Sequence, residues 1–246
     1  MINKYSVLGI IPARGGSKGI KNKNLIKLNN YPLIYWPIKA LKKSKYIDNF
    51  ILSTDSKRIS KVANQFNCKT PFLRPKSISN DNSSSISLVI HALDYFKSKN
   101  MNYDYVVLLE PTSPLTTEND IDRAIKVLEH NQTYADSIVG VSKNINLHPE
   151  FNYKIDKKGL IKFKKKTYSK RRQNLTTNFF LDGSLYISKV SSIYKHKTFY
   201  HNKTLGFITP KWKSFELDDK IDLLILNAIM KNKKNYEKKF RSKIFR

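Results

Sequence analysis

The stretch VLGIIPARGGSKGIKNKNL, residues 7–25, decides the fold and carries most of the functional information in this chain. Its first part, Val7–Ile11, is a continuous apolar run that stops at Pro12, the pattern of a strand buried on both faces of a parallel sheet. A loop rich in glycine and basic residues follows, with Arg14, Gly15, Gly16, Lys18, Gly19, Lys21 and Lys23. Glycine lets backbone N–H groups approach anionic oxygens, and the cations neutralise the charge of those oxygens. The stretch therefore predicts a polyphosphate-binding loop after a buried first strand.

This loop differs from two common phosphate-binding patterns. It has neither the GxxxxGK[ST] spacing of a Walker-A loop nor the GxGxxG spacing of a dinucleotide fingerprint. The alternative interpretation is a solvated, lysine-rich surface turn. That alternative suits any single lysine of the loop, but it does not account for the whole string.

Strand and helix patterns alternate through the first 141 residues. We expect strands at 7–11, 49–54, 105–109 and 137–141, and helices at 33–41, from Asp55 or Ser56 to 66, at 84–97 and at 118–129. Pro37 must kink or delay the first of these helices. Such alternation predicts an α/β fold with a mostly parallel sheet and helices on both faces. Ligands of such sheets bind at the carboxyl ends of the strands, where the glycine-rich loop lies.

The pattern changes near Lys143. Two short apolar segments, 153–155 and 160–163, flank Asp-Lys-Lys-Gly and predict a hairpin with Gly159 in its turn. Core-like segments then resume at 185–187, 205–208 and 221–230, the last of them a helix. The very basic part between is therefore interpreted as an insertion, at about 144–177, in a single domain that spans residues 1–246.

The composition is that of a globular protein with an extreme positive charge. The chain has 246 residues, of which 40% are hydrophobic, and a net charge of +27. Such a charge suggests nucleic acid or an anionic membrane as a partner. Only eight of the 46 basic residues are Arg, however, and the lysines are spread along the chain, whereas nucleic-acid readers rely on Arg. We expect no nucleic-acid role and expect the positive field to steer anionic substrates instead.

The sequence predicts a cytoplasmic protein without a membrane anchor. No apolar stretch approaches the ~20 residues of a transmembrane helix. The apolar run near the N-terminus is better interpreted as a core strand than as a signal peptide. The single cysteine, Cys68, cannot form an internal disulfide. The five histidines lack the spacing of zinc ligands, and no GxSxG motif indicates a serine hydrolase.

The first loop resembles that of the acylneuraminate cytidylyltransferases, which make CMP-sialic acid and related CMP-activated sugars. The resemblance implies a CTP-binding role for the loop, with Arg14, Gly16, Ser17, Lys18 and Lys23 at the phosphates and Asn24 at the cytosine. Arg14, Lys18 and Lys23 would also stabilise the charge that grows on pyrophosphate.

A second block, LRPKSISNDNSSSISLVIHAL at residues 73–93, resembles the same family. The resemblance implies that Arg74 contacts cytosine and that Ser84 and Ser85 contact ribose or phosphate at a helix N-terminus, where unpaired N–H groups attract anions. The alternative is that these serines simply cap the helix. Asp81 would hold the loop rather than touch substrate.

A third block, LLEPTSPL at residues 108–115, resembles the strand-end motif that faces the sugar in this family. Glu110, Thr112 and Ser113 are the implied sugar-binding residues. Many members have Gln in place of Glu110 and Arg in place of Thr116. Because a carboxylate beside an acidic sugar is costly unless it meets a hydroxyl, amine or cation, Glu110 predicts a different sugar substituent or a carboxylate that faces away. The alternative is a purely structural proline loop.

A fourth block, RRQNLTTNFFLDGSLYIS at residues 171–188, also resembles the family. It implies that Arg172, Gln173 and Tyr186 bind the sugar, Arg172 across a dimer interface. Asp182 stands where Asn is usual, and Phe180 where many members have Arg. The alternative for Arg172 is one more surface cation.

The fifth block is FELDDKIDLLIL, residues 215–226, where family members bind Mg²⁺ through carboxylates. The resemblance implies Asp218 and Glu216 as metal ligands. In an extended segment, residues i and i+2 point the same way, so both can face one cation, and Mg²⁺ needs only one or two carboxylates beside phosphate and water. The alternative is that Asp218 or Asp219 caps the following helix.

Taken together, the five blocks imply a Rossmann-like nucleotidyltransferase fold with a small inserted dimerisation subdomain. They imply an enzyme that joins CTP and a nine-carbon acidic (nonulosonic) sugar into a CMP-sugar and pyrophosphate for surface glycan synthesis, with Mg²⁺ as cofactor and a homodimer as assembly. Two alternatives stay open. One is a cytidylyltransferase for another acidic sugar such as legionaminate, pseudaminate or Kdo, although the Kdo-activating relatives have a different first loop. The other is a catalytically silent, basic nucleotide- or nucleic-acid-binding protein on the same fold.

Overall fold

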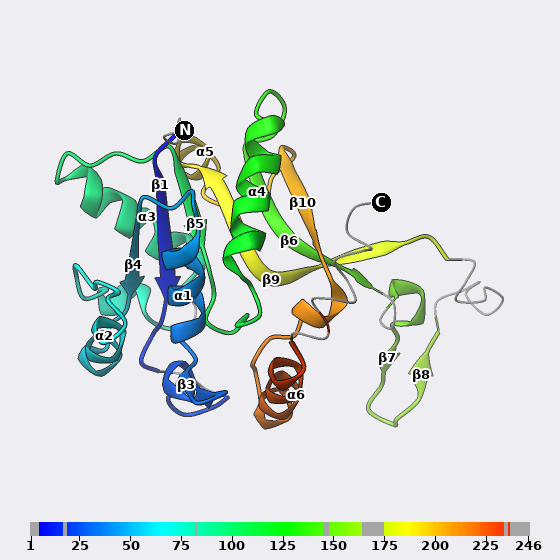
Figure 1. Ribbon diagram of the computed structural model, residues 1–246. Coiled ribbons are helices and arrows are strands. Elements are labelled where there is room, and N and C mark those ends of the chain that lie inside the picture. Colours follow the sequence, from blue (N-terminus) through cyan, green and yellow to red (C-terminus); the bar gives the residue numbers. More distant parts are fainter. Residues whose placement is uncertain are drawn as a thin grey trace.

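A six-stranded sheet forms the centre of the computed structural model, which describes residues 5–16, 19–81, 83–144, 148–163, 175–233 and 236 (Figure 1). Its strands lie in the order β10 (Thr204–Thr209), β6 (Ser137–Asn144), β9 (Asn178–Lys189), β5 (Tyr105–Leu108), β1 (Val7–Pro12) and β4 (Asn49–Ser53). β9 is antiparallel to both of its neighbours, while the β1–β4, β1–β5 and β6–β10 pairs are parallel. The predicted mostly parallel sheet is confirmed.

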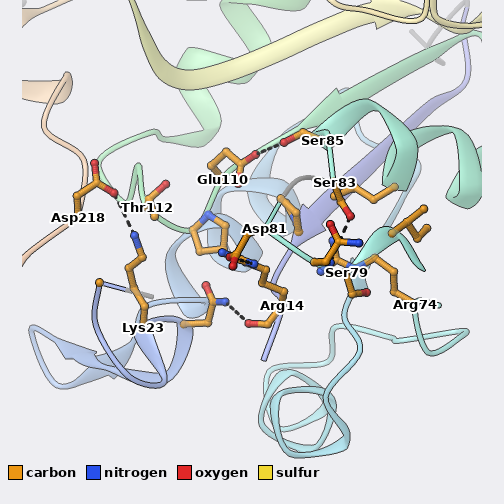
Figure 2. Close-up of a pocket in the computed structure, with 17 residues that line it drawn as sticks. Arg14, Lys23, Arg74, Ser79, Asp81, Ser83, Ser85, Glu110, Thr112 and Asp218 are labelled. Carbon is orange, nitrogen blue, oxygen red and sulfur yellow. Dashed lines mark hydrogen bonds and ion pairs between the residues drawn. The ribbon is translucent and has the colours of Figure 1, made fainter. Parts of the chain in front are cut away.

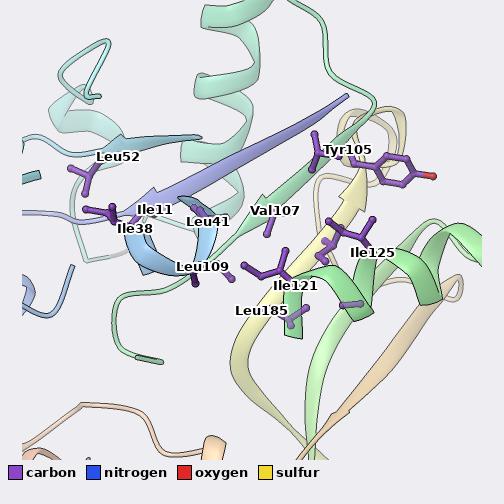
Figure 3. Packing of buried hydrophobic residues seen from close by; sticks show 14 of the residues in the cluster. Ile11, Ile38, Leu41, Leu52, Tyr105, Val107, Leu109, Ile121, Ile125 and Leu185 are labelled. Atoms are coloured by element: carbon purple, nitrogen blue, oxygen red, sulfur yellow. The ribbon is translucent and has the colours of Figure 1, made fainter. Parts of the chain in front are cut away.

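Helices cover both faces of this sheet, as the alternation of strands and helices predicted. They are α1 (Tyr35–Lys43), α2 (Lys57–Asn64), α3 (Ser85–Lys97), α4 (Glu118–His130), α5 (Val190–His196) and α6 (Lys220–Lys231). Side chains alternate along each buried strand, so Ile11 and Val107 pack under α1 and α4, whereas Ile10 and Val106 pack on the side of α3 and α5. Figure 3 shows the first of these two clusters, in which Ile38 of α1 and Ile121 of α4 meet the sheet.

A third apolar cluster attaches α6 beside the glycine-rich loop. α6 contributes Leu226, Ile229 and Met230, which pack with Leu28 of a small hairpin and with Trp212. That hairpin consists of β2 (Lys27–Leu28) and β3 (Tyr31–Pro32). Short 3₁₀ turns lie at Lys23–Leu25, Lys76–Ile78, Pro149–Phe151 and Lys211–Lys213. This packing brings the segment before α6 next to the first loop, 194 residues earlier in the sequence.

The predicted hairpin after residue 143 is present and stands apart from the central sheet (Figure 1). β7 (Lys154–Ile155) pairs with β8 (Ile161–Lys162), and Gly159 has φ +82° in the turn. Its apolar side chains are open to solvent: Ile155 is 68% exposed and Leu160 is 63% exposed. Residues 145–147 and 164–174 of the expected insertion lie outside the described residues, so its limits stay a prediction.

Several predicted element ends shift. α1 begins at Tyr35 rather than Leu33, which leaves Pro37 in the first turn, where its missing N–H costs nothing. Ser56, not Asp55, caps α2, because its Oγ accepts the N–H of Ile59. α5 was not expected, and β9 is far longer than the expected 185–187, with an irregularity opposite Val139 and Val141.

Candidate functional site

A cavity of about 520 Å³ opens at the carboxyl ends of β1 and β5. Of the described residues, three basic ones line it, Arg14, Lys23 and Arg74, together with three acidic ones, Asp81, Glu110 and Asp218. Figure 2 shows Lys23 and Asp218 at one end, Arg74 at the other, and Arg14 with Asp81 between them. The cavity also takes in Asn24, Ser85 and Thr112, so residues from four of the five sequence blocks meet here.

The first loop is fixed by backbone contacts. Asn24 Nδ2 donates to the carbonyl oxygen of Arg14 at 3.0 Å, and the N–H of Gly15 donates to Asp55 Oδ1 at 2.8 Å. A Cβ on Gly16 would meet nothing within 4 Å, whereas one on Gly19 would lie 3.0 Å from the carbonyl oxygen of Asp218. Gly19 therefore allows the close approach of this loop to the segment before α6. Ser17 and Lys18, two predicted phosphate ligands, lie outside the described residues.

Two basic side chains of the cavity are paired with carboxylates. Arg14 Nη1 lies 2.5 Å from Asp81 Oδ1. Lys23 Nζ lies 3.0 Å from Asp218 Oδ1 and donates to the carbonyl oxygen of Leu217 at 2.9 Å. Both pairs bridge segments that are distant in sequence, one pair at an end of the cavity and the other near its middle. The expectation that Asp81 holds its loop agrees with its pairing to Arg14.

Arg74 is the most buried of the three cations, with 6% of its surface exposed. Its Nη2 donates to the carbonyl oxygen of Ser53 at 3.2 Å. Burial lowers the pKa of Arg74, and the carboxylates of Asp55 and Glu110 oppose that effect. A buried guanidinium held at a cavity wall is suited to reading a planar polar group such as a base.

The serines at the start of α3 divide between two positions. Ser84 is the N-cap residue, but among the described contacts its side chain makes no capping hydrogen bond. Ser85 lines the cavity, and its Oγ donates to Glu110 Oε1 at 3.2 Å. The simple capping interpretation therefore does not account for Ser85.

Glu110 is a carboxyl group whose pKa is raised to about 7. Burial is the main cause, and the charge of Glu216 adds to it, while Ser85, Arg74 and Lys23 act in the opposite direction. The carboxyl does not face away from the cavity, which was one of the two expectations for this residue.

We expect Glu110→Gln to stabilise the protein in a pH-dependent way. Because the folded pKa lies above the unfolded value near 4.5, the unfolded state ionises first, and the wild-type protein loses stability as the pH rises from about 4.5 to about 7. Urea unfolding should show the variant to be roughly 2–3 kcal/mol more stable than wild type at pH 8 and nearly equal to it at pH 4.5. Glu150→Gln, on an exposed side chain, is the control and should give no such difference. A constant difference between pH 4.5 and 8 would contradict the burial of Glu110.

The side chains of two predicted sugar ligands, Ser113 and Tyr186, contact other parts of the protein. Ser113 is 4% exposed, and its Oγ lies 3.0 Å from the carbonyl oxygen of Gly183 and 2.9 Å from Glu216 Oε1. Tyr186 packs against Phe199 and Tyr200, and neither it nor Ser113 lines the cavity. Their sugar contacts stay predictions, as do those of Arg172 and Gln173, which lie outside the described residues. Thr112 does line the cavity.

The departures from the family pattern at Thr116 and Asp182 are structural. Thr116 Oγ1 donates to the carbonyl oxygen of Ser184 at 2.8 Å in the protein interior. Asp182 is 2% exposed and accepts hydrogen bonds from Ser142 and Thr209. Neither side chain lines the cavity, so neither departure changes the charge of its wall.

The two predicted metal ligands have different surroundings. Glu216 is bound by Ser113 and packs on Gly183, which has φ +64° and whose Cβ, if present, would lie 1.9 Å from Glu216 Oε1. Burial raises the pKa of Glu216. The side chain of Asp218 is 75% exposed and lines the cavity. Asp219, whose Oδ1 accepts the N–H groups of Ile221 and Asp222, caps α6, so the capping alternative holds for Asp219 and not for Asp218.

The surroundings of Asp218 fit an Mg²⁺ ion that is bound through a single protein carboxylate. Among the described residues no three His, Cys, Asp or Glu side chains cluster as a metal cage. One exposed carboxylate beside an anion-binding cavity suits Mg²⁺, which takes its remaining ligands from phosphate and water.

Sequence reasoning gave Asp55 no role in the site. Asp55 lies two residues after the end of β4, at the same sheet edge as the first loop, and that position was the available signal. Ile78, Ser79, Asn80 and Ser83 also line the cavity and were not selected.

Comparison with known proteins identifies the family. The sequence profile of the cytidylyltransferase family matches residues 8–239. The chain belongs to the cytidylyltransferase family. It is thus a nucleotidyltransferase, and the predicted resemblance is confirmed.

Relatives of this cytidylyltransferase act on several sugars. It is 34% identical to the CMP-N,N'-diacetyllegionaminic acid synthase of Legionella pneumophila and 31% identical to a pseudaminic acid cytidylyltransferase of Campylobacter jejuni, covering 91% of this chain and 96% of each relative. It is 29% identical to the N-acylneuraminate cytidylyltransferase of Escherichia coli, over 96% of this chain but only 54% of that protein. The chain thus spans about half the length of the E. coli relative.

Solved structures confirm the nucleotidyltransferase fold. A CMP:2-keto-3-deoxy-manno-octonic acid synthetase complexed with CTP superposes with a TM-score of 0.66, at 14% identity over 93% of this chain and 99% of that chain. The 4-diphosphocytidyl-2C-methyl-D-erythritol synthase of Anaerococcus prevotii gives a TM-score of 0.62, at 12% identity over 93% and 100%. None of the helices described for this chain combines the length and apolar character needed to cross a bilayer.

Proposed function

We propose that this cytidylyltransferase transfers CMP from CTP to a nonulosonic acid of the sialic type and releases pyrophosphate. One observation carries the proposal: the cavity at the strand ends combines Arg14, Lys23 and Arg74 with the exposed carboxylate of Asp218. Three cations match a triphosphate and a base, and the carboxylate matches the cation that accompanies a triphosphate. The named activities of the relatives support the same reaction.

The residues act by alignment and charge neutralisation. The anomeric hydroxyl of the sugar attacks the α-phosphorus, a new P–O bond forms, and the bond to the β-phosphate oxygen breaks as the hydroxyl proton is released. Arg14 and Lys23 exchange their carboxylate partners for phosphate oxygens and stabilise the charge on departing pyrophosphate. Arg74 and Ser85 orient the base and the ribose from the opposite end of the cavity.

Asp218 is the residue that would hold Mg²⁺, with Glu216 behind it. When bound, the ion would neutralise phosphate charge and lower the pKa of the attacking hydroxyl. Lys23 pairs with Asp218, so the lysine would move to phosphate once the carboxylate took up a cation.

Glu110 and Thr112 would face the sugar. Because the pKa of Glu110 is near 7, its carboxyl can be a donor or an acceptor of a hydrogen bond close to neutral pH. This supports an acidic sugar that presents a hydroxyl or an amide at that point. Acylneuraminate, legionaminate and pseudaminate types stay candidates, and cytoplasmic location stays the prediction from the cysteine content.

We propose a homodimer formed through the hairpin end of the molecule. The exposed apolar surface there comprises Ile155, Leu160, Ile161 and Phe163 of the hairpin and Phe179, Phe180 and Leu181 of β9. Such a surface on a protein with many charged residues supports association with a second copy. Light scattering should give a dimeric mass, and Leu160→Glu with Leu181→Glu should give a monomer. A monomeric wild-type mass at assay concentration would count against the dimer.

The nucleotide half of the proposal is tested by a comparison of CTP, UTP, ATP and GTP at equal concentration with Mg²⁺ and mixed nonulosonic acids. Pyrophosphate release should require CTP and a sugar together. Release that proceeds equally with all four nucleotides, or without sugar, would reject it.

A further inference from the structure

The end of β4 supports two separate segments of the nucleotide cavity. The N–H of Ala13, in the first loop, donates to the carbonyl oxygen of Ser53 at 2.9 Å. The N–H of Arg74 donates to the carbonyl oxygen of Thr54 at 2.8 Å, and its guanidinium donates to Ser53. The first loop and Arg74 therefore depend on the same short stretch of backbone.

Asp55 is the next residue, and its carboxylate acts on both segments. Oδ1 accepts the N–H of Gly15 at 2.8 Å. Burial lowers the pKa of Arg74, and Asp55 is the strongest of the charges that oppose this. Within the described residues, Arg74 Nε is buried without a hydrogen-bond partner, so the buried guanidinium depends on a nearby negative charge. Asp55 itself does not line the cavity.

We propose that Asp55 is a positioning residue for CTP, which fixes the first loop at Gly15 and compensates the charge of Arg74. This inference rests on the proposed function. Asp55 acts through its two neighbours, because a loop anchored at Gly15 presents Arg14 at a fixed place and a charge-compensated Arg74 stays at the cavity wall. Preorganisation of this kind lowers the ordering cost of binding a flexible triphosphate.

The chain offers a matched control at the other end of the same strand pair. Asp48 Oδ2 accepts the N–H of Val7 at 2.7 Å. This bond has the same chemistry as the Asp55–Gly15 bond, since an aspartate oxygen accepts a backbone N–H. It links the residue before β4 to the first residue of β1, at the edge of the sheet away from the cavity. A purely structural role for Asp55 would make the two aspartates equivalent.

The experiment measures CTP affinity by calorimetry without sugar, and KM and kcat by pyrophosphate release, for Asp55→Ala, Asp55→Asn and Asp48→Ala. Asp55→Ala should weaken CTP binding about tenfold or more, raise KM for CTP more than it lowers kcat, and leave KM for the sugar unchanged. Asp55→Asn should be intermediate, since its amide oxygen still accepts from Gly15 but no longer offsets Arg74, and it serves if the alanine variant folds poorly. Asp48→Ala should lose thermal stability and keep wild-type CTP affinity.

Amide hydrogen exchange without nucleotide gives a second readout. Exchange over residues 13–16 should quicken in Asp55→Ala and not in Asp48→Ala. Three results would overturn the inference on Asp55 and leave the proposed function standing. They are CTP affinity within twofold of wild type in Asp55→Ala, equal losses of CTP affinity in both alanine variants, and unchanged exchange over residues 13–16. Wild-type protein that binds no CTP would instead reject the proposed function, and with it the role in CTP binding.

Discussion

Asp218→Ala should reduce turnover on the order of 10³-fold or more while the protein stays folded. The reason is that Asp218 presents a 75% exposed carboxylate to the cavity and is the proposed Mg²⁺ ligand. Loss of 10³-fold in rate corresponds to about 4 kcal/mol of transition-state stabilisation. Pyrophosphate release at saturating CTP and sugar measures the effect, and thermal unfolding checks the fold.

The adjacent residue supplies the control for this prediction. Asp219 caps α6 through two backbone N–H groups, so Asp219→Ala should cost about 1 kcal/mol of stability and leave turnover close to wild type. Asp218→Ala should therefore lose turnover and stay folded, whereas Asp219→Ala should lose some stability and keep its turnover. Near-normal turnover in Asp218→Ala would remove this residue as a metal ligand.

Asp120→Ala should be among the most destabilising single substitutions in the protein, at about 3–5 kcal/mol. Asp120 and Lys213 form an ion pair in which both side chains are at most 10% exposed. Removal of the carboxylate leaves the ammonium of Lys213 buried without a counter-charge in its described contacts, which are then the hydroxyl of Thr117 and the ring of Trp212. It also breaks the capping box at the start of α4. Urea unfolding measures the loss.

Two further variants separate the buried charge from the loss of packing. Asp120→Leu combined with Lys213→Met should recover much of the lost stability, because removal of both charges leaves no unpaired ion. Asp122→Ala, on the same helix but bound to Ser44 near the surface, should cost far less. Equal losses in Asp120→Ala and in the double variant would contradict the account of a buried, unpaired lysine. Lys213 precedes the segment of Glu216 and Asp218, so weakened anchoring should also lower turnover.

The sequence was most informative where local pattern and tertiary position agree. The run Val7–Ile11 is apolar without interruption because both of its faces are covered by helices, and that burial is visible in the residues themselves. The cavity is likewise predictable, since loops that follow parallel strands gather at one sheet edge. Arg14, Lys23, Arg74, Glu110 and Asp218 accordingly meet as expected.

Features that depend on partners distant in the chain were not predictable. β9 carries exposed apolar residues such as Leu181 and bends at Gly183, so its pattern does not have the regular alternation of a strand. Ser113 looked like a substrate ligand because of its motif, but its hydroxyl contacts Gly183 and Glu216, 70 and 103 residues away. Local spacing predicts helix capping for Asp55 or Ser56, whereas the carboxylate of Asp55 accepts the N–H of Gly15. In each case the deciding contact is a tertiary one that no local spacing encodes.

The most direct test of the central claim is product formation from CTP, Mg²⁺ and single nonulosonic acids, each followed by mass spectrometry and pyrophosphate release. Acylneuraminate, legionaminate and pseudaminate types should be tried separately, with Kdo as the eight-carbon comparison. The account predicts a CMP-sugar and an equal amount of pyrophosphate with at least one nine-carbon acid, and far less with Kdo. No pyrophosphate with any sugar, alongside tight and salt-sensitive binding of RNA, would contradict it.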